Sequence, residues 1–167
     1  MMRRDSMIVF ISVLLISVTI FTTLVLSSGL AAKPLFSKTP EIIINSDFSI
    51  TVNYHAREFG KRTANVTLSS HAIALVGCVN PGGNLSPSKG SMIEQMQIQS
   101  EKVKPKDGDI EGSLTLVPPV LPSASDICPN KNWSTGILSL TYENVAMEIK
   151  QKNSEILKLN LGNVSQQ

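Results

Sequence analysis

The segment Leu138-Ser-Leu-Thr-Tyr-Glu-Asn-Val-Ala-Met-Glu-Ile149 decides the fold class of this chain of 167 residues. Its apolar side chains occupy even positions as far as Tyr142 and odd positions from Val145 onward. A period of two is typical of a β-strand with one buried face. Because such a strand buries the same face along its length, the change of parity at Glu143-Asn144 predicts a β-bulge or a bend there.

The residues that follow predict a β-hairpin. Three leucines alternate with polar residues over 157–161, after the polar stretch Lys152-Asn153-Ser154. A register that keeps every apolar side chain on one face leaves 152–154 as a three-residue loop, in which Asn153 or Ser154 takes the left-handed conformation. This register pairs Val145 with Leu161, Met147 with Leu159, and Ile149 with Leu157.

Other segments also carry the strand pattern. Alternation predicts strands over 48–54, 63–79 and 110–116, and the turn residues Asn80-Pro-Gly-Gly-Asn84 follow the second of them. Met92, Met96 and Ile98 share one parity and predict a weaker strand, with a helix over 91–104 as the alternative. No helical period is sustained after residue 32. We therefore predict an all-β chain, folded as an antiparallel β-sandwich of the immunoglobulin-like or a related type.

The N-terminus has the pattern of an export segment. Arg3 and Arg4 precede the uncharged run Met7–Leu26, and small residues follow up to Ala32. A helix over 7–26 is long enough to span a membrane, so this hydrophobic helix is either a cleaved signal peptide, which we favour, or a retained anchor. We expect residues 1–32 to be this segment, 33–40 a linker and 41–167 the β-domain, placed outside the cell or at its surface.

The two cysteines, Cys78 and Cys128, both follow the export segment. In an oxidising compartment an even count predicts a disulfide, and Trp133 is expected to cover the bridge. A thiolate metal pair is the alternative, but His55 and His71 lie at no ligand spacing from the cysteines or from each other. We expect no metal and no cofactor.

Candidate glycosylation sites are provided by four Asn-x-Ser/Thr triplets. If the host glycosylates exported proteins, their asparagines should lie in exposed loops or strand edges. These asparagines are Asn65, Asn84, Asn132 and Asn163.

Charge and motif content argue against two functional classes. Residues 33–167 hold thirteen basic and twelve acidic side chains, a formal charge of +1. This near-neutral charge argues against nucleic-acid binding, which depends on clustered lysine and arginine side chains that neutralise phosphates. No Gly-x-Ser-x-Gly or His-Glu-x-x-His motif occurs, and Asp107, Asp109 and Glu111 fit a solvated turn before a strand. We therefore expect no enzyme.

Two motifs resemble those of a known group. The segment Ala74–Asn84, with its Cys-x-Asn-Pro-Gly-Gly turn, and the later Cys128-Pro-x-x-x-Trp133 resemble small secreted bacterial proteins of unknown function. The similarity covers about residues 63–161, and the Lys-rich stretch 101–109 departs from it. The resemblance implies an exported single-domain β-protein and no particular activity.

Together these patterns predict a function in binding. We expect an exported or surface-attached, non-catalytic module that binds an envelope component, a glycan or a protein. The loops Asn80–Ser91 and Val117–Asn132 are expected to form one rim of the sandwich. The alternative is an envelope assembly subunit anchored in the membrane by residues 7–26.

Overall fold

The computed structural model describes residues 33–152 and 156–167. The chain divides into two units after Ala32, where the predicted export segment ends. That segment and residues 153–155, which include most of the predicted hairpin loop, lie outside the described residues. Within the described residues the second unit contains eight strands and one short helix: β1 Leu35–Phe36, β2 Glu41–Ile44, β3 Ile50–Arg57, β4 Ala64–Val79, β5 Leu85–Val103, β6 Ile110–Leu116, α2 Ala124–Ile127, β7 Ser134–Gln151 and β8 Leu157–Gln166.

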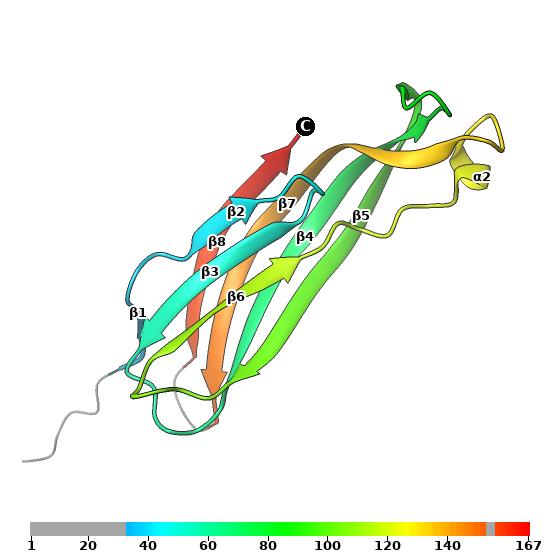
Figure 1. Cartoon of the computed structure of the whole chain (residues 1–167). Helices are drawn as coiled ribbons and strands as arrows, with labels where there is room; N and C mark the ends of the chain where they lie inside the picture. Colours follow the sequence, from blue (N-terminus) through cyan, green and yellow to red (C-terminus); the bar gives the residue numbers. More distant parts are fainter. Residues whose placement is uncertain (1–32, 153–155) are drawn as a thin grey trace, which may run out of the picture. The chain divides into compact units, whose positions relative to one another are not determined.

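The strands form two antiparallel sheets (Figure 1). The larger sheet has the order β5-β4-β7-β8. The smaller sheet is centred on β3, which pairs with β6 along one edge and with β1 and β2, end to end, along the other. Ile50 pairs with both Ile44 and Leu116, which places β2 and β6 on opposite sides of β3. The predicted all-β class with antiparallel pairing is confirmed.

Alternating apolar residues bury one face of each central strand. In β3 the buried residues are Ile50, Val52, Tyr54 and Ala56, and the residues between them are partly exposed. The predicted start at Phe48 is two residues early, because Phe48 adopts a positive φ of 65° in the turn before β3. The strand predicted over 63–79 is confirmed as β4, and the strand predicted over 110–116 is confirmed as β6.

The change of parity in β7 is a β-bulge, as predicted. Pairing with β8 shifts between Tyr142 and Val145, and Asn144 adopts a positive φ of 53°. Its backbone N–H donates to the Asn163 Oδ1 at 2.9 Å. The bulge allows Tyr142 and Val145, which are both completely buried, to face the same core.

The predicted hairpin register is confirmed for two pairs and wrong by one residue for the third. Met147 pairs with Leu159 and Ile149 with Leu157. Val145 pairs with Gly162 instead of Leu161, because a second irregularity falls between Val145 and Ala146. Gly162 has a φ of +87°, a conformation that glycine adopts without the steric cost other residues meet.

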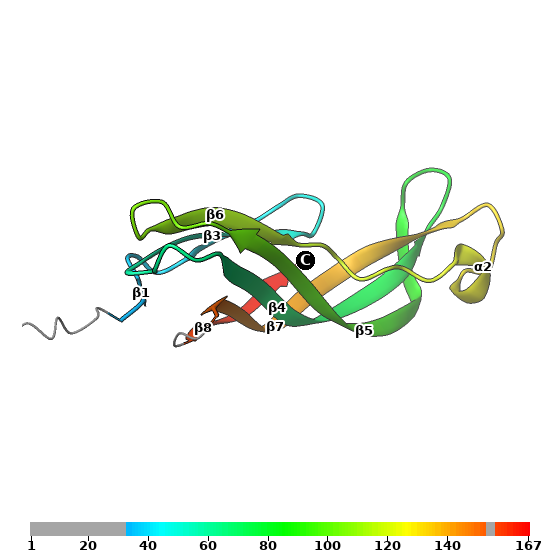
Figure 2. The same ribbon diagram turned by 90° about the horizontal axis from the view of Figure 1, so that it is seen from below.

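Both sheets contribute to one hydrophobic core. Tyr142 of β7 joins them most directly, since its hydroxyl donates to the backbone carbonyls of Phe48 at 3.0 Å and Leu116 at 3.4 Å. Tyr54 of β3 donates in the other direction, to Glu101 Oε1 of β5 at 2.5 Å. Figure 2 shows the smaller sheet lying over the larger one.

One segment differs from the expectation, and one open alternative is decided. In the predicted linker 33–40, Leu35 and Phe36 pair with Arg57 and Ala56 as β1, so this segment is part of the smaller sheet. The weaker strand predicted around Met92, Met96 and Ile98 is confirmed as part of β5, and the alternative, a helix over 91–104, is wrong. Met92, Met96 and Ile98 face solvent, with 67%, 58% and 63% of their surface exposed.

Candidate functional site

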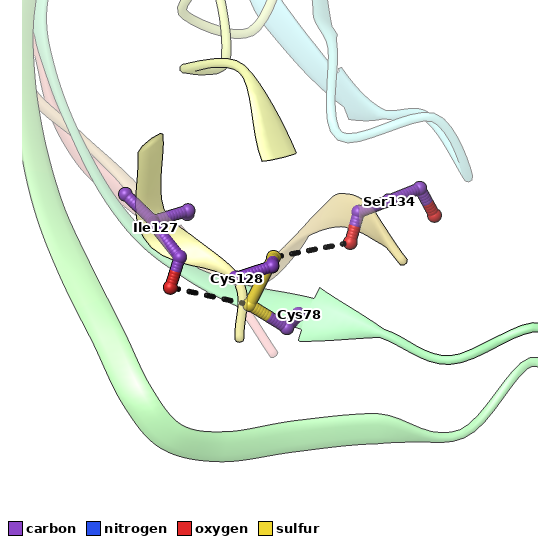
Figure 3. Close-up of a disulfide and its surroundings, with 4 residues drawn as sticks. All are labelled: Cys78, Ile127, Cys128 and Ser134. Carbon is purple, nitrogen blue, oxygen red and sulfur yellow. Dashed lines mark hydrogen bonds between the residues drawn. A yellow bond between two sulfur atoms is a disulfide. The ribbon is translucent and has the colours of Figure 1, made fainter. Parts of the chain in front are cut away.

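A disulfide ties the loop after β6 to the end of β4, as predicted. Cys78 and Cys128 are 50 residues apart in sequence and their Cα atoms are 5.6 Å apart. Each sulfur lies 3.7 Å from a backbone carbonyl oxygen, Cys78 Sγ from that of Ile127 and Cys128 Sγ from that of Ser134 (Figure 3). Since oxidised sulfur has no proton to donate, we treat these as packing contacts. Cys78 is almost completely buried.

The same bridge brings two turns to one end of the larger sheet (Figure 1). β4 and β7 pair up to Val79 and Ser134, so the turn after β4 and the turn before β7 are neighbours. We call residues 80–84 and 128–133 the tethered rim. Of the two loops predicted to share a rim, the start of the first (80–84) and the end of the second (128–132) are brought together. The predicted loop Asn80–Ser91 is too long, because β5 begins at Leu85.

Hydrogen bonds fix both turns of the tethered rim. In the first turn, the Asn80 N–H donates to Asn84 O at 3.1 Å and the Gly83 N–H donates to Asn80 O at 2.9 Å. The Asn84 N–H also donates to Asn80 Oδ1 at 3.0 Å, and Gly83 has a φ of +80°. In the second turn, the Trp133 N–H donates to Asn130 O at 3.1 Å. A turn closed in this way presents its side chains at low entropic cost.

The tethered rim presents amide and aromatic side chains. Asn84, Asn130, Lys131 and Asn132 are exposed, and Trp133 is partly exposed. Amides donate and accept hydrogen bonds, and an indole combines a large apolar face with one N–H donor. This combination suits a polar ligand that has an apolar face. That the Trp133 side chain covers the disulfide remains a prediction.

The four asparagines of the candidate glycosylation sites are all exposed. Asn84 and Asn132 belong to the tethered rim. Asn163 lies on the edge strand β8. Asn65 lies on β4, where its Nδ2 donates to Thr67 Oγ1 at 3.1 Å. Because β4 pairs with β5 and β7 at this residue, the expected position in a loop or on a strand edge is wrong for Asn65. Exposure agrees with what the modification would need, and modification itself remains a prediction.

The titratable side chains that could support catalysis lie in separate places. His55 Nε2 on β3 is 3.2 Å from Asp109 Oδ2, at the turn before β6. His71 Nε2 on β4 is 3.8 Å from Glu94 Oε2 on β5. Among the described residues no group of three His, Cys, Asp or Glu side chains could hold a metal ion.

Two buried tyrosines have raised pKa values for different reasons. Burial, with the charge of Asp47, raises the pKa of Tyr142 to about 12. Burial, followed by the hydrogen bond to Glu101 and its charge, raises the pKa of Tyr54 further. The pKa of the exposed Asp47 is lowered, mainly by the hydrogen bond from the Ser49 hydroxyl. The two tyrosines have a structural role, because the hydroxyl of each forms a hydrogen bond that connects the two sheets.

The sequence analysis missed an apolar surface on the larger sheet. We call Leu75, Met92, Met96 and Ile98 the outer stripe; Leu75 of β4 pairs with Met92 of β5 and is 38% exposed. The shared parity of the three β5 residues was visible in the sequence, but only the register with β4 shows that this parity faces outward. The opposite face carries Gln95, whose Oε1 accepts from the Val120 N–H at 3.2 Å.

No protein-family model matches the chain, and neither a curated protein nor a solved structure matches it. The resemblance to small secreted β-proteins therefore still depends on the two sequence motifs alone. In residues 33–152 and 156–167 no helix is long and apolar enough to cross a membrane.

Proposed function

We propose that this protein is an exported, non-catalytic β-sandwich module, of the immunoglobulin-like or a related type, that binds a carbohydrate-bearing envelope component through the tethered rim. The observation that carries the proposal is the rim itself. Asparagine amides and a partly exposed tryptophan stand on two turns that a disulfide and the β4–β7 pairing hold together.

The sandwich assignment is supported by the core. Buried side chains of the two sheets form one hydrophobic cluster, and Tyr142 hydrogen-bonds across it. Two antiparallel sheets that share an apolar core are the defining arrangement of this architecture. It leaves the turns at each end of the sheets available for binding.

Export is supported by the pattern of residues 1–32 and is compatible with the disulfide. Disulfides persist in oxidising compartments and are rare in the cytosol. A non-catalytic role is supported by the positions of the histidines. The His55 imidazole is joined to Asp109 and the His71 imidazole lies near Glu94. The hydroxyl of Ser37 donates to the backbone carbonyl of His55, and in the described part of the chain no hydrogen bond joins either imidazole to a serine.

A carbohydrate ligand fits the side chains of the tethered rim. Sugar rings offer an apolar face for stacking on an aromatic ring and hydroxyls for hydrogen bonds to amides. A disulfide-fixed rim needs little further ordering on binding, which favours affinity.

Glycan-array and cell-wall binding by the protein produced from the full chain tests the proposal. We expect Trp133→Ala to weaken binding at least about tenfold, the size of a binding hot spot. The matched control is Phe36→Ala, which removes a half-buried aromatic side chain of the smaller sheet. Absence of binding by the parent protein, or equal binding by the Trp133 variant, would contradict the proposal.

Glycosylation of the rim and ligand binding by the rim exclude one another. Asn84 and Asn132 both lie in the tethered rim, so a glycan on either would cover it. Intact-mass measurement of the native protein decides the matter. Rim binding requires both rim asparagines to be unmodified, which leaves Asn65 and Asn163 as the candidate glycosylation sites. A glycan on Asn84 or Asn132 would contradict rim binding and support the modification predicted there from the sequence.

A second candidate function is an envelope assembly subunit, retained in the membrane by residues 7–26. It is favoured by the long edge strand β5, whose stretch 90–100 is described below. Sequencing of the mature N-terminus separates the two functions. A start near Ala32 or Lys33 would exclude the anchored subunit, and retention of 7–26 would support it.

A further inference from the structure

The strands at the edges of the two sheets differ in how well they are protected from pairing with another chain. Natural edge strands avoid such pairing by being short, bulged, or charged. In the smaller sheet β2 has 4 residues and β1 has 2, and β6 has 7 with the exposed Glu111. In the larger sheet the pairing of β8 with β7 is interrupted by two irregularities around Val145, and β8 carries Lys158. All of these edges have a protective feature.

The edge strand β5 lacks such features over its central part. It has 19 residues, and its register with β4 runs without a shift from Ala64–Val103 to Val76–Ser91. Between Gly90 and Ser100 it contains no proline, and Glu94 is the one charged residue. Two hydrogen bonds reach β5 from the smaller sheet and its loops, from the Val120 N–H to Gln95 and from the Tyr54 hydroxyl to Glu101, and both of these residues belong to the inner face of β5.

This unprotected stretch coincides with the outer stripe. Met92, Met96 and Ile98 follow one another along the same face of β5, each more than half exposed. Apolar side chains gathered on a surface mark interaction sites more often than isolated ones do. An open backbone edge beside an apolar face is the combination that β-strand addition uses.

We propose that β5 pairs antiparallel with β5 of a second copy of this chain, around a two-fold axis at Gln95, and joins the two larger sheets into one. This inference goes beyond the proposed rim function and does not depend on it. The rim lies at the end of the sheet, and the pairing uses its edge.

The sequence of β5 selects this partner and this register. A two-fold axis at Gln95 sets Met92 opposite Ile98 of the other copy and Glu94 opposite Met96, on the outer face. An axis at Glu94 would set two carboxylates opposite each other, which is unfavourable. Axes at Met96 or Gln97 shorten the paired segment and lose the Met92–Ile98 pair. The Gln95 register therefore combines nearly full length with apolar pairing and no like charges opposite.

Sedimentation of the protein produced from the full chain, with its disulfide intact, tests the proposal. We expect a monomer–dimer equilibrium within the range of about 1 μM to 1 mM. Met92→Lys and Ile98→Glu should each raise the dissociation constant at least about tenfold, because each places a charge in an apolar pair. The combined variant should recover much of this loss, since the register sets the two opposite charges face to face.

Matched controls keep the test specific. Asn160→Lys adds a charge at an exposed position of the other edge strand, β8, and should leave the equilibrium unchanged. A parent protein that is monomeric over the whole range would overturn the proposal. Dimerisation that survives Met92→Lys or Ile98→Glu would overturn it as well.

A trapping experiment checks the register without weakening the edge. In a mixture of Glu94→Cys and Met96→Cys proteins the two new thiols lie directly opposite each other, within disulfide reach. We expect a cross-linked heterodimer from the mixture and far less from either variant alone. Equal cross-linking in all three samples would contradict the Gln95 axis.

Discussion

Removal of the Tyr142 hydroxyl tests whether the two sheets are joined through their shared core. Tyr142 is completely buried, and its hydroxyl donates to the Phe48 carbonyl at 3.0 Å and the Leu116 carbonyl at 3.4 Å. The substitution Tyr142→Phe keeps the ring and its packing. It leaves the carbonyl of Phe48, in the turn before β3, and that of Leu116, in β6, without this donor.

The expected cost follows from the hydrogen bonds. A net contribution of about 0.5–1.5 kcal/mol is usual for one hydrogen bond, and a buried acceptor left unsatisfied costs about 1–3 kcal/mol. The bond to Leu116 is long and contributes less than the bond to Phe48. We therefore expect Tyr142→Phe to lower the free energy of unfolding by about 1–2 kcal/mol at pH 7.

The same residue predicts a dependence on alkaline pH. Burial raises the pKa of Tyr142 from its ordinary value of 10.0 to about 12. Above pH 10 the unfolded chain loses the proton and the folded chain retains it, so the unfolded state is favoured as pH rises. The stabilisation is present below pH 10 and is lost progressively towards pH 12, with a slope of at most about 1.4 kcal/mol per pH unit.

Denaturant unfolding at pH 7 and between pH 9 and 11 measures both effects. Tyr142→Phe should lower stability at pH 7 and reduce the alkaline slope. Tyr54→Phe is the comparison, because its pKa is also raised and its hydroxyl bonds to Glu101 of the opposite sheet. A Tyr142 variant with parental stability at pH 7 and an unchanged alkaline slope would refute the reasoning.

Three further substitutions test the disulfide, a close contact and the bulge. In denaturant unfolding, the double variant Cys78→Ala/Cys128→Ala should have a free energy of unfolding about 4 kcal/mol lower than the parent, the value that the chain-entropy model gives for the 50-residue separation. A loss below about 1 kcal/mol would contradict a stabilising disulfide. Gly77→Ala should lower the free energy of unfolding by about 1–3 kcal/mol in the same assay, because a Cβ there would lie 2.8 Å from Leu138 Cδ1 and 3.1 Å from the Ser86 carbonyl oxygen. In the control Gly60→Ala, the Cβ would lie 3.4 Å from its nearest neighbour, so this substitution should cost little. Asn144→Val should lower the melting temperature and Asn144→Gly should not, because a φ of 53° strains a β-branched residue and suits glycine. Equal effects of the two substitutions would contradict a left-handed conformation at this bulge residue.

Local patterns predicted much of the larger sheet. The parity change at Glu143-Asn144 is a strong signal, because it can be accommodated only by a bulge or a bend if one face stays buried. The pairs Met147–Leu159 and Ile149–Leu157 followed from the same rule. The shift at Val145 did not, since it depends on the left-handed conformation of Gly162, for which the alternating pattern has no signal.

The face of β5 was not predictable from its own residues. Its apolar residues share one parity, as they would in a strand that packs them inward. The register with β4 sets Gln97 opposite the buried Ser70, and thereby turns Met96 outward opposite His71. Which parity faces the core is thus a property of the neighbouring strand.

The candidate site was predictable in part. Two cysteines beyond an export pattern were enough to predict the disulfide. The closeness of Asn80 and Trp133 required the pairing of β4 with β7 up to Val79 and Ser134, which connects strands separated by β5 and β6 in sequence. Such long-range pairing leaves no mark in the local sequence of either turn.

Peptide mapping of the native protein by mass spectrometry, without reduction, tests the central claim most directly. That claim is an exported β-domain whose rim is fixed by an oxidised Cys78–Cys128 pair. We predict one linked peptide pair that contains both cysteines. Recovery of Cys78 and Cys128 as two separate peptides with free thiols would contradict the claim.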